Sequence, residues 1–414
     1  MSSGSEWDAA TAIAYLQSPQ AIRDRCTVLF DLACADKLTH FRCDLEKLDA
    51  TAAYVLEVIR DQYPDLDVPF HSRWRHFEGD GSDRLQTFYA GLAGASPIER
   101  ARSQVDLAVT SVLLDAGAGA QWQFCEPGTQ QMWQRSEGLA IASLYLFQAG
   151  AFSSQMASPF QADASGLRAF SQEELCQGFQ VSDRNPLVGV GGRVQLLNQL
   201  GRAIAQNPGL FPGTLPRPGN LVDYLVTQAT DGKLAATTVF RAVMEGFGSI
   251  WPGRVAIAGV NLGDVWPHSS LPDTGIGSQL VPLHKLSQWL TYSLLEPLQD
   301  LGLTITDLDQ LTGLAEYRNG GLCVDMGLLQ PKHDGVLGDR HLPSSEVIVE
   351  WRALTVVLLD RIAAALRAQL GQDETQLPLV KVLEGGTWTA GRRLAQAKRG
   401  GLPPIQIDSD GTVF

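Results

Sequence analysis

Apolar residues recur at three- and four-residue spacing along much of the chain, a pattern that is typical of amphipathic helices. The strongest example runs from Val347 to Leu370, where the apolar face is nearly continuous and must be largely buried. The same spacing predicts further helices over residues 9–35, 45–62, 99–119 and 135–152. The last of these has Ser136 as its expected N-cap. We therefore expect a mainly α fold with minor β structure, organised as a compact helical body.

The domain organisation is predicted from changes in composition along the chain. Ser, Gly, Pro and Asn become frequent over residues 153–220, which predicts a loop-rich insertion with short helical patterns. Because no low-complexity linker separates independent blocks, we expect residues 1–414 to form a single composite domain. Within this domain, residues 281–370 are predicted to form a helical catalytic core. Residues 375–414 are predicted to form a C-terminal tail that packs on the body.

Charge and composition narrow the choice of partners. The 414 residues contain 32 Lys and Arg against 45 Asp and Glu, a formal net charge of −13, which argues against binding to long nucleic acid. No apolar run reaches the roughly 20 residues that a membrane span requires. The chain begins with the polar sequence MSSGSEWD, and its six cysteines form no CxxC pair. We therefore predict a cytoplasmic protein with reduced thiols and a small-molecule partner.

The arrangement of possible metal ligands predicts neither a metal nor another cofactor. Spacings of eight and nine residues separate Cys26, Cys34 and Cys43, which does not match the usual ligand motifs, so buried structural thiols are expected. Asp106 and Asp115 lie nine residues apart on a predicted helix and therefore face roughly opposite sides. We expect these two carboxylates to serve in capping or core hydrogen bonding.

The stretch from Val281 to Leu329 carries the most chemical information. It begins with an apolar-periodic helix that opens at His284 and Lys285 and is predicted to end in the region of Pro297 and Gly302.

The segment that follows this helix is DLDQLTGLAEYRNGGL, which predicts a short helix, a glycine-containing turn and a second short segment. This arrangement brings Glu316 and Arg318 out at a junction, where functional groups are held precisely. Together with Lys285, they could bind a phosphorylated sugar and assist departure of its base. A surface salt bridge within EYR, with the Tyr ring packed down, explains the same residues without a function.

Other segments contribute cations and aromatic residues. The dense cluster VPFHSRWRHFEGDGSDR contains Arg73 and Trp74 and suits a sugar or phosphate, although Arg73 could equally pair with an acidic neighbour. Asp264, Trp266 and His268 follow an apolar segment and could line a pocket or form a packed turn.

Two charged residues interrupt the apolar face of the helix over residues 347–370. Glu350 and Arg352 each need a partner there, because burial of a lone charge is costly. Either they orient Lys285, Glu316 or Arg318, or they form an internal ion pair.

Segments distributed over essentially the whole chain resemble those of a known family. HSRWRHFE, NPLVG, VPLHKLSQWLTYSLLEPL, LTGLAEYRNGGL and KVLEGGTW are similar to the fungal and bacterial uracil-catabolism family once catalogued only as a domain of unknown function. The resemblance implies a route that opens uracil after its conversion to the nucleotide and proceeds through a ribosylated urea. Members have been labelled uracil phosphoribosyltransferases, but the acidic run and phosphate loop of those enzymes are missing from this sequence. We therefore reject that label.

A more distant resemblance concerns the queuosine-salvage nucleosidases, whose fold is similar to that of helix-hairpin-helix DNA glycosylases. PLHKLSQ, LAEYRNGG and VEWRALT stand in the same order as three motifs of that family, and FHSRW resembles a fourth. The resemblance places Lys285 on the helix lysine, Glu316 on the catalytic aspartate and Arg318 on its arginine. Glu350 and Arg352 fall on the last motif. The change from Asp to Glu adds one methylene to the reach of the carboxylate.

The chemistry of ribosyl C–N cleavage fits these residues. Cleavage builds positive charge on the sugar ring, which a fixed carboxylate can stabilise while it orients water. We predict an N-glycosidase of uracil catabolism that converts a ribosylurea or related ribonucleotide to urea and ribose or ribose phosphate, without a metal. The alternative is a non-catalytic ligand-binding or regulatory protein of uracil metabolism.

The predicted roles follow from charge and shape. Glu316 and Lys285 are the predicted catalytic residues, and a 5-phosphate would be held by Lys285 and nearby arginines. His284 and His268 are predicted to contact the leaving group. Asp264, with an aromatic wall such as Trp266, would suit urea. The predicted substrate-binding residues are Arg318, His284, Arg73, Trp74, Asp264, Trp266, His268, Glu350 and Arg352.

Overall fold

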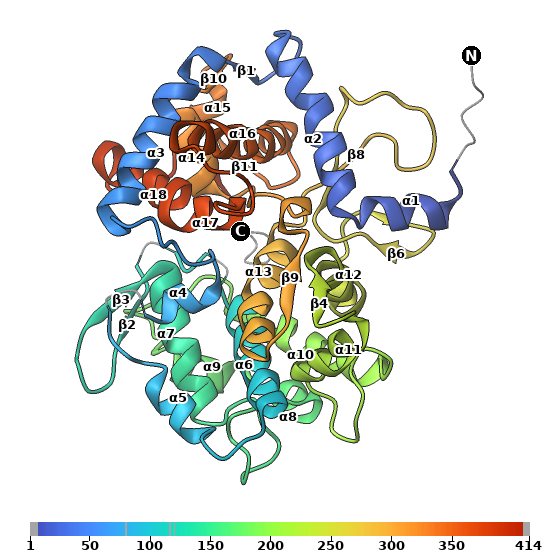
Figure 1. The fold of residues 1–414 in the computed structure, drawn as a ribbon, viewed down its shortest axis with the longest axis vertical. Coiled ribbons are helices and arrows are strands. Elements are labelled where there is room, and N and C mark those ends of the chain that lie inside the picture. Colours follow the sequence, from blue (N-terminus) through green and yellow to red (C-terminus); the bar gives the residue numbers. More distant parts are fainter. Residues whose placement is uncertain (1–6, 79–80, 116, 120, 409–414) are drawn as a thin grey trace. The chain divides into compact units, whose positions relative to one another are not determined.

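The computed structural model describes residues 7–78, 81–115, 117–119 and 121–408, which form two compact, mainly helical units (Figure 1). Unit 1 contains residues 7–71, 253–288 and 307–408, and unit 2 contains the described parts of 72–252 together with 289–306. Strands occur only as short pairs among these residues. The predicted mainly α class with minor β structure is therefore confirmed.

Unit 1 is built from helices of very different length. These are α1 (Ala9–Leu16), α2 (Pro19–Cys34), α3 (Leu48–Gln62), the start of α13 (Lys285–Asp300), α14 (Tyr317–Asp325), α15 (Gly335–Gly338), α16 (Glu346–Leu370), α17 (Leu379–Val382) and α18 (Trp388–Arg399), with 3-10 turns η1 (Leu45–Lys47) and η4 (Leu308–Gln310) and the π-helical turn η5 (Leu383–Thr387). Its strands are β1 (Phe41–Cys43), β5 (Ala256–Ile257), β6 (Val260–Asn261), β7 (Val265–Pro267), β8 (Leu280–Pro282), β10 (Leu329–Pro331), β11 (Arg340–His341) and β12 (Gln406–Ile407).

Unit 2 is also helical, with two short strand pairs. Its helices are α4 (Arg73–Phe77), α5 (Gln86–Gly91), α6 (Pro97–Leu113), α7 (Arg135–Gln148), α8 (Ala164–Ala169), α9 (Gln172–Gly178), α10 (Val190–Gln206), α11 (Leu221–Gln228), α12 (Ala236–Phe247) and residues 289–300 of α13, with 3-10 turns η2 (Pro218–Asn220) and η3 (Gly248–Ile250). Its strands are β2 (Gln123–Cys125), β3 (Met132–Gln134), β4 (Lys233–Ala235) and β9 (Thr304–Thr306). The segment predicted as a loop-rich insertion, residues 153–220, contains α8, α9, α10 and η2.

The strand pairs tie together segments that are distant in sequence. In unit 1, β1 and β10 pair antiparallel with Phe41 opposite Pro331, and β7 and β8 pair antiparallel with Val265 opposite Pro282. β5 and β6 form a short hairpin, and β11 and β12 run parallel. In unit 2, β2 pairs antiparallel with β3, and β4 pairs parallel with β9.

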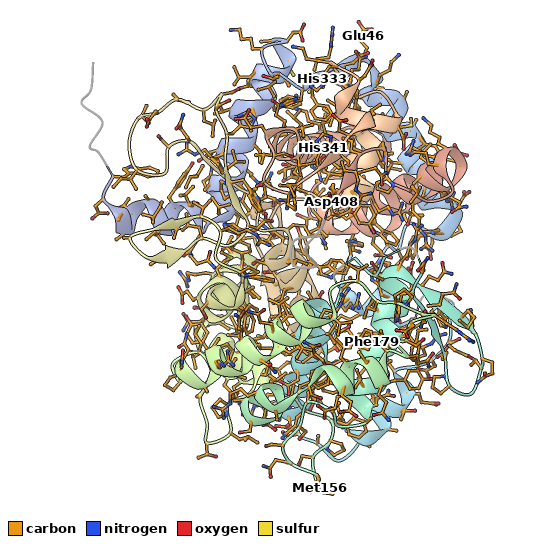
Figure 2. The ribbon with its side chains drawn as sticks, turned by 180° about the vertical axis from the view of Figure 1, so that it is seen from behind. Glu46, Met156, Phe179, His333, His341 and Asp408 are labelled. Carbon is orange, nitrogen blue, oxygen red and sulfur yellow. The ribbon has the colours of Figure 1, made fainter. Side chains whose placement is uncertain are left out.

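The parallel pair β11–β12 anchors the C-terminal segment within unit 1. The main-chain N–H of Asp408 donates to the carbonyl oxygen of His341 at 2.9 Å, and Figure 2 labels both residues. The Arg340 Nε also donates to the Asp408 carboxylate at 2.7 Å. The sequence from Asp408 to Gly411 is typical of a turn, but its last three residues lie outside the described residues.

The buried helix predicted over residues 347–370 is confirmed as α16, which packs against α2, α3 and α14 of unit 1. Most of its apolar residues from Val347 to Leu366 are buried, whereas Val357 and Ala365 are half-buried and Ala364 is exposed. Burial of one large apolar side chain contributes about 1.5–3 kcal/mol, so the buried face of this helix is a large part of what stabilises the unit. The helix ends at Gly371, which has a φ of +65° that a residue without a Cβ adopts at no steric cost.

The helix predicted over residues 9–35 is two helices. α1 ends at Leu16, and α2 begins at Pro19, with the Ser18 hydroxyl accepting the N–H of Ala21 at 3.1 Å. Proline is favoured in the first helical turn because it has no N–H to satisfy there. The expected N-cap Ser136 is also corrected, because β3 leads directly into α7 and Gln134 occupies the N-cap position.

The helix predicted to end in the region of Pro297 and Gly302 ends there as α13, at Asp300, and Pro297 lies inside its last turn. Proline in a helix leaves the carbonyl four residues earlier without its usual N–H partner. Here that carbonyl belongs to Ser293, and it accepts the indole N–H of Trp74 at 2.9 Å. A tertiary contact inside unit 2 thus replaces the missing main-chain bond and allows the helix to continue.

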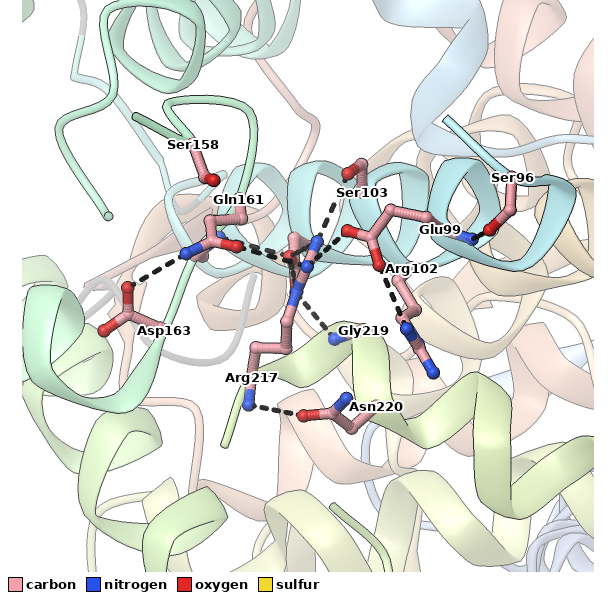
Figure 3. A network of polar contacts seen from close by, with 12 residues as sticks. Ser96, Glu99, Arg102, Ser103, Ser158, Gln161, Asp163, Arg217, Gly219 and Asn220 are labelled. Atoms are coloured by element: carbon pink, nitrogen blue, oxygen red, sulfur yellow. Dashed lines mark hydrogen bonds and ion pairs between the residues drawn. The ribbon is translucent and has the colours of Figure 1, made fainter. Parts of the chain in front are cut away.

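A buried ionic network ties the chain together in unit 2 (Figure 3). Asp106 on α6 accepts the Nε of Arg217 at 2.6 Å and the main-chain N–H groups of Gly219 at 2.6 Å and Ala162 at 3.2 Å. Arg217 also donates to Glu99 at 2.6 Å. The predicted role of Asp106 in core hydrogen bonding is therefore confirmed, because its carboxylate joins α6 to two segments more than fifty residues away.

Glycines allow α14 to pack closely within unit 1. A Cβ on Gly391 of α18 would collide with the carbonyl oxygen of Arg318, and a Cβ on Gly320 would lie 2.7 Å from the Trp351 indole of α16. Gly321 lies against Pro404 in the same way. Close packing at these glycines, against the main chain of Arg318 and the side chains of Trp351 and Pro404, therefore fixes the position of α14.

We expect Gly391→Ala to destabilise the protein by about 1–3 kcal/mol, because the added methyl must push α18 away from α14. Urea denaturation measures this change. Gly338→Ala is the matched control, since a Cβ at that position meets nothing within 4 Å. Equal stability of the two variants would contradict the packing argument.

Candidate active site

Asp264 organises the polar part of unit 1. Its carboxylate forms a two-pronged ion pair with Arg352, with Nη1–Oδ1 and Nη2–Oδ2 distances of 2.8 and 2.7 Å. It also accepts the indole N–H of Trp266 at 2.7 Å and the main-chain N–H of Lys285 at 3.0 Å. Burial opposes ionisation, but the charge of Arg352 and these donors outweigh it and hold the pKa of Asp264 well below its usual range.

Arg352 connects this ion pair to the segment that carries Glu316. Its Nε donates to the carbonyl oxygen of Ala315 at 3.0 Å, while its two terminal nitrogens bind Asp264. All three nitrogens of the guanidinium are therefore engaged, and the side chain is only 2% exposed. The planar shape of the guanidinium fixes the relative positions of β7, the start of α13 and the residue just before Glu316.

Glu316 occupies the N-cap position of α14. Its Oε2 accepts the main-chain N–H of Arg318 and its Oε1 that of Asn319, both at 2.6 Å. A carboxylate is favoured at this end of a helix, where N–H groups point outward. Because each carboxylate oxygen has two acceptor sites, the group can still accept a further donor.

Burial decides the protonation chemistry of this carboxylate. The Glu316 residue is only 7% exposed, and burial raises its pKa above the ordinary value of 4.5. The positive charge of Lys285 and the N–H groups of Arg318 and Asn319 oppose this rise. The result is a buried carboxylate in an electropositive setting, a combination that is common at active sites.

Lys285 is the first residue of α13, and its half-buried side chain acts electrostatically on Glu316. The preceding residue, His284, has a φ of +43°, an uncommon conformation for a side chain with a Cβ. The main-chain N–H groups of Leu283 and His284 both donate to the carbonyl oxygen of Asp264, at 2.9 and 3.3 Å. These bonds hold the turn that positions Lys285.

The ring of His284 has a specific partner. Its Nε2 lies 2.8 Å from the carbonyl oxygen of Leu16, so the proton of the neutral ring is on Nε2. Burial lowers the pKa of His284, which favours this neutral form. The Nε2 of His284 therefore points to the last residue of α1.

Arg318 contributes to the site chiefly through its main chain. Its N–H binds Glu316, whereas its guanidinium donates to the carbonyl oxygen of Gly401 at 3.0 Å. The guanidinium also lies over the ring of Tyr317, 4.9 Å from the ring centroid. The structure thus gives a third arrangement of EYR, in which a buried cap takes the place of the surface salt bridge considered from sequence.

His268 and Glu350 form a separate buried pair in unit 1. The His268 Nδ1 accepts the N–H of Ser270 at 3.2 Å, so its other nitrogen carries the proton and faces Glu350 at 3.5 Å. Glu350 also accepts the main-chain N–H of His40 at 3.1 Å. Glu350 and Arg352 are two positions apart on α16 and therefore point to different sides of the helix.

Arg73 and Trp74 belong to unit 2, where both are buried. The Arg73 Nη1 forms an ion pair with Asp115 at 2.7 Å, and its Nε donates to the Ser111 hydroxyl at 2.7 Å. The indole of Trp74 binds the carbonyl of Ser293. The pairing with an acidic neighbour that the sequence left open for Arg73 is therefore present.

Sequence reasoning missed several members of the site. The carbonyl of Ala315 and the N–H of Asn319 act through main-chain atoms, which carry no signal in residue type. The contact between His71 and Glu384, 2.6 Å from Nδ1 to Oε2, was also missed. Both segments, HSRWRHFE and KVLEGGTW, stood out in the sequence, but nothing in the spacing connected them.

The sequence over residues 15–414 matches the model of a family described as "Protein of unknown function (DUF1688)". The chain belongs to this family. It is 40% identical to "Uracil catabolism protein 4" of Lachancea kluyveri over 440 positions, which cover 97% of this chain and 99% of that protein. It is 37% identical to "Protein urg3" of Schizosaccharomyces pombe (strain 972 / ATCC 24843) over 411 positions, with the same two coverages.

Two features are absent from residues 7–78, 81–115, 117–119 and 121–408 of this DUF1688 member. No helix there is both long and apolar enough to cross a membrane. No group of three or more His, Cys, Asp or Glu side chains in the same residues is arranged to hold a metal ion.

The stability contributed by Asp264 should depend on pH. Its pKa is depressed in the folded state, so its contribution is present above the unfolded value of about 3.9 and is lost as the pH falls below it. We expect Asp264→Asn to cost about 3–5 kcal/mol at pH 7, because it leaves Arg352 buried without its counter-charge. Urea denaturation of both proteins at pH 7 and pH 3 should show this difference shrinking in acid.

The control for this experiment is Asp408→Asn, which removes an exposed partner of Arg340. Such surface pairs contribute about 0–1 kcal/mol. A difference between wild type and Asp264→Asn that stayed constant from pH 7 to pH 3 would contradict the assigned ion pair.

Removal of the positive charge at Lys285 should raise the pKa of Glu316 further, because that charge favours the ionised carboxylate. Carbon-13 NMR of the Glu316 carboxyl group in Lys285→Met measures this directly and does not require activity. Lys37→Met, the same change at an exposed lysine, is the control and should leave the titration unchanged. A titration that moved to lower pH in Lys285→Met would overturn the assigned interaction.

Proposed function

We propose that this protein is an N-glycosidase of uracil catabolism that hydrolyses the C–N bond of a ribosylurea or a related ribonucleotide. The products are urea and ribose or ribose phosphate. The observation that carries the proposal is the buried Glu316 carboxylate, fixed by two main-chain N–H groups and influenced by the charge of Lys285. A carboxylate fixed in this way can stabilise positive charge that develops on a sugar ring placed next to it.

The proposed reaction uses these residues as follows. As the bond between C1′ and nitrogen breaks, the electron pair leaves with nitrogen and positive charge develops on the sugar ring. The Glu316 carboxylate stabilises this charge and takes a proton from the water whose oxygen adds to C1′. Arg352 binds the carbonyl of the preceding residue, Ala315, and is itself held by two bonds to Asp264, so the carboxylate needs little reorganisation when the charge appears.

Lys285 is proposed to serve two purposes. Its charge supports the ionised form of Glu316, which the reaction requires. As a half-buried ammonium at a helix start, it also suits a phosphate group on the substrate. Unphosphorylated and 5-phosphorylated substrates should therefore be compared.

The relatives support the metabolic setting. One of them is named a uracil catabolism protein and matches this chain from end to end at 40% identity. Similarity of this extent supports a role of the chain in uracil metabolism. The proposal of an N-glycosidase reaction is based on the arrangement of Glu316 and Lys285, and not on the relatives.

A ligand-binding or regulatory protein of uracil metabolism is the second candidate. Both oxygens of Glu316 already accept main-chain N–H groups, which is also the arrangement of a purely structural cap. In that case the protein would bind a ribosyl ligand without turnover.

Glu316→Ser separates these two roles. Serine is a strong N-cap, so stability should change by no more than about 1–2 kcal/mol, but the carboxylate is lost. Urea release from synthetic ribosylurea should fall by at least about 100-fold. The measurement is a coupled urea assay with and without a 5-phosphate on the sugar.

Glu46→Ser makes the same change at an exposed glutamate and should keep full activity (Figure 2). If Glu316→Ser retained activity, Glu316 would be a cap alone and the proposed mechanism would be wrong. Tight binding of ribosylurea by the wild-type protein without urea release would favour the regulatory candidate.

A further inference from the structure

The rings of His40 and His333 are in direct contact in unit 1. The Nδ1 of His40 lies 2.9 Å from the Nε2 of His333, and the two ring centroids are 5.2 Å apart. A neutral imidazole has one ring N–H and one lone pair, so this contact needs a single proton between the two nitrogens. Two positively charged rings have only donors, and they repel each other. The contact is therefore compatible with no more than one positive charge.

The main chain of His40 joins two other parts of unit 1. Its N–H donates to the Glu350 carboxylate of α16 at 3.1 Å, and its carbonyl oxygen accepts the N–H of Lys332 at 2.9 Å. The second bond extends the antiparallel pair of β1 and β10 by one residue on each strand. The ring contact with His333 comes directly after this last main-chain bond. His333 therefore attaches the start of the segment after β10 to the start of β1.

The segment that begins at this contact, residues 333–345, is weakly packed. Within this fully described segment, only Val336 and Pro343 are buried, whereas Leu337 and Leu342 are exposed. Its helix α15 is a single turn, and β11 pairs with β12 over only two residues. Segments with few buried apolar contacts open at the lowest cost in free energy. One side-chain contact at the start of such a segment can therefore change how often it opens.

Charged groups on several elements act on His40. Burial lowers its pKa, and a positive charge on His333 lowers it further. The carboxylates of Glu350 and Glu346, both on α16, oppose this fall, whereas a charge on His268 adds to it. The carboxylates favour one positive charge on the pair of rings, but they do not remove the repulsion between two.

Charged groups also lie around His333. The ammonium of the preceding residue, Lys332, is bound to the carboxylate of Asp36 at 2.9 Å. A Cβ on Gly335 would lie 2.9 Å from the Asp339 Oδ2 and 3.3 Å from the His333 Nδ1, so this carboxylate is near the outer nitrogen of the ring. A nearby carboxylate favours a positive charge on His333, but it supplies no acceptor between the two rings.

We propose that His40 and His333 form an acid-sensitive latch that holds residues 333–345 against the start of β1. A single proton between Nδ1 of His40 and Nε2 of His333 keeps the latch closed. When both rings are positively charged, each of these nitrogens carries its own proton from solvent. The hydrogen bond is then lost, and the two charges push the rings apart. The latch is independent of the proposed glycosidase reaction.

The pH range of opening follows from the number of protons that each state binds. In the opened segment both histidines titrate near the ordinary pKa of 6.5, whereas the closed latch resists the second proton. The contribution of the latch is therefore complete above pH 6.5 and is lost as the pH falls below this value. One extra proton in the open state raises the opening equilibrium by up to about tenfold per pH unit.

Amide hydrogen exchange measures this opening at single residues. The N–H groups of Lys332, Gly338 and Asp339 donate to main-chain carbonyl oxygens at 2.9, 2.9 and 3.1 Å, so their protection reports on the closed segment. After correction for the intrinsic pH dependence of exchange, wild-type protection should fall by about three- to tenfold per pH unit from pH 6.5 to pH 5. His333→Gln keeps an amide that can hydrogen-bond to His40 without titrating, so its protection should change by less than about twofold per pH unit.

His341→Gln is the matched control, because it removes a histidine of the same segment whose Nε2 lies 3.1 Å from the carbonyl oxygen of Val336 (Figure 2). Its protection should vary with pH as steeply as that of the wild type. Equal steepness in His333→Gln and the wild type would overturn the latch and assign the effect to the other groups near His40. Loss of the pH dependence in His341→Gln would also overturn it.

Carbon-13 NMR of the histidine rings in the wild-type protein tests the latch without any variant. The rings of His40 and His333 should titrate in two steps that are separated by at least about one pH unit, because they share one proton. A single common step near the ordinary pKa of histidine would show that the rings do not interact, and it would refute the latch.

Discussion

The ion pair between Arg352 and Asp264 is the interaction on which the candidate site depends. Removal of one partner of a buried ion pair is strongly destabilising, because the remaining charge cannot be solvated. Here the pair also has a geometric role. The guanidinium binds Asp264 with two nitrogens and the carbonyl of Ala315 with the third. One side chain thus joins the turn before Lys285 to the residue before Glu316.

Around this pair, main-chain atoms set the chemistry of Glu316. Its two oxygens are held by the first N–H groups of α14, and α14 is held by glycine contacts with α16 and α18. Burial raises the pKa of the carboxylate, and the charge of Lys285 limits the rise. Structural and proposed catalytic roles therefore overlap in this region.

Unit 2 uses charge in a different way. Asp106 and Arg217 are buried together, and Asp106 binds main-chain groups of distant segments. Arg73 pairs with Asp115 and donates to the Ser111 hydroxyl. These groups hold loops onto helices. A buried arginine by itself is therefore weak evidence for ligand binding, since both arginines have partners that account for their burial.

The sequence by itself determined the helical class, the buried helix over residues 347–370 and the presence of Glu316 at a junction. Periodicity records which face of a helix is buried, and this information is local. Only the tertiary structure decided which partners the buried charged side chains Arg352 and Glu350 have. Arg352 reaches across 88 residues to Asp264, while Glu350, two positions away, faces His40 and His268.

The same distinction explains why α13 continues past Pro297 to Asp300. From sequence, Pro297 predicts a stop because it removes a main-chain hydrogen bond. The indole of Trp74, more than two hundred residues earlier, binds the carbonyl left without that partner, and the helix continues. Likewise, the link between His71 and Glu384 spans 313 residues. Residue type and spacing encode local preference, whereas the choice among distant partners is made only when the chain packs.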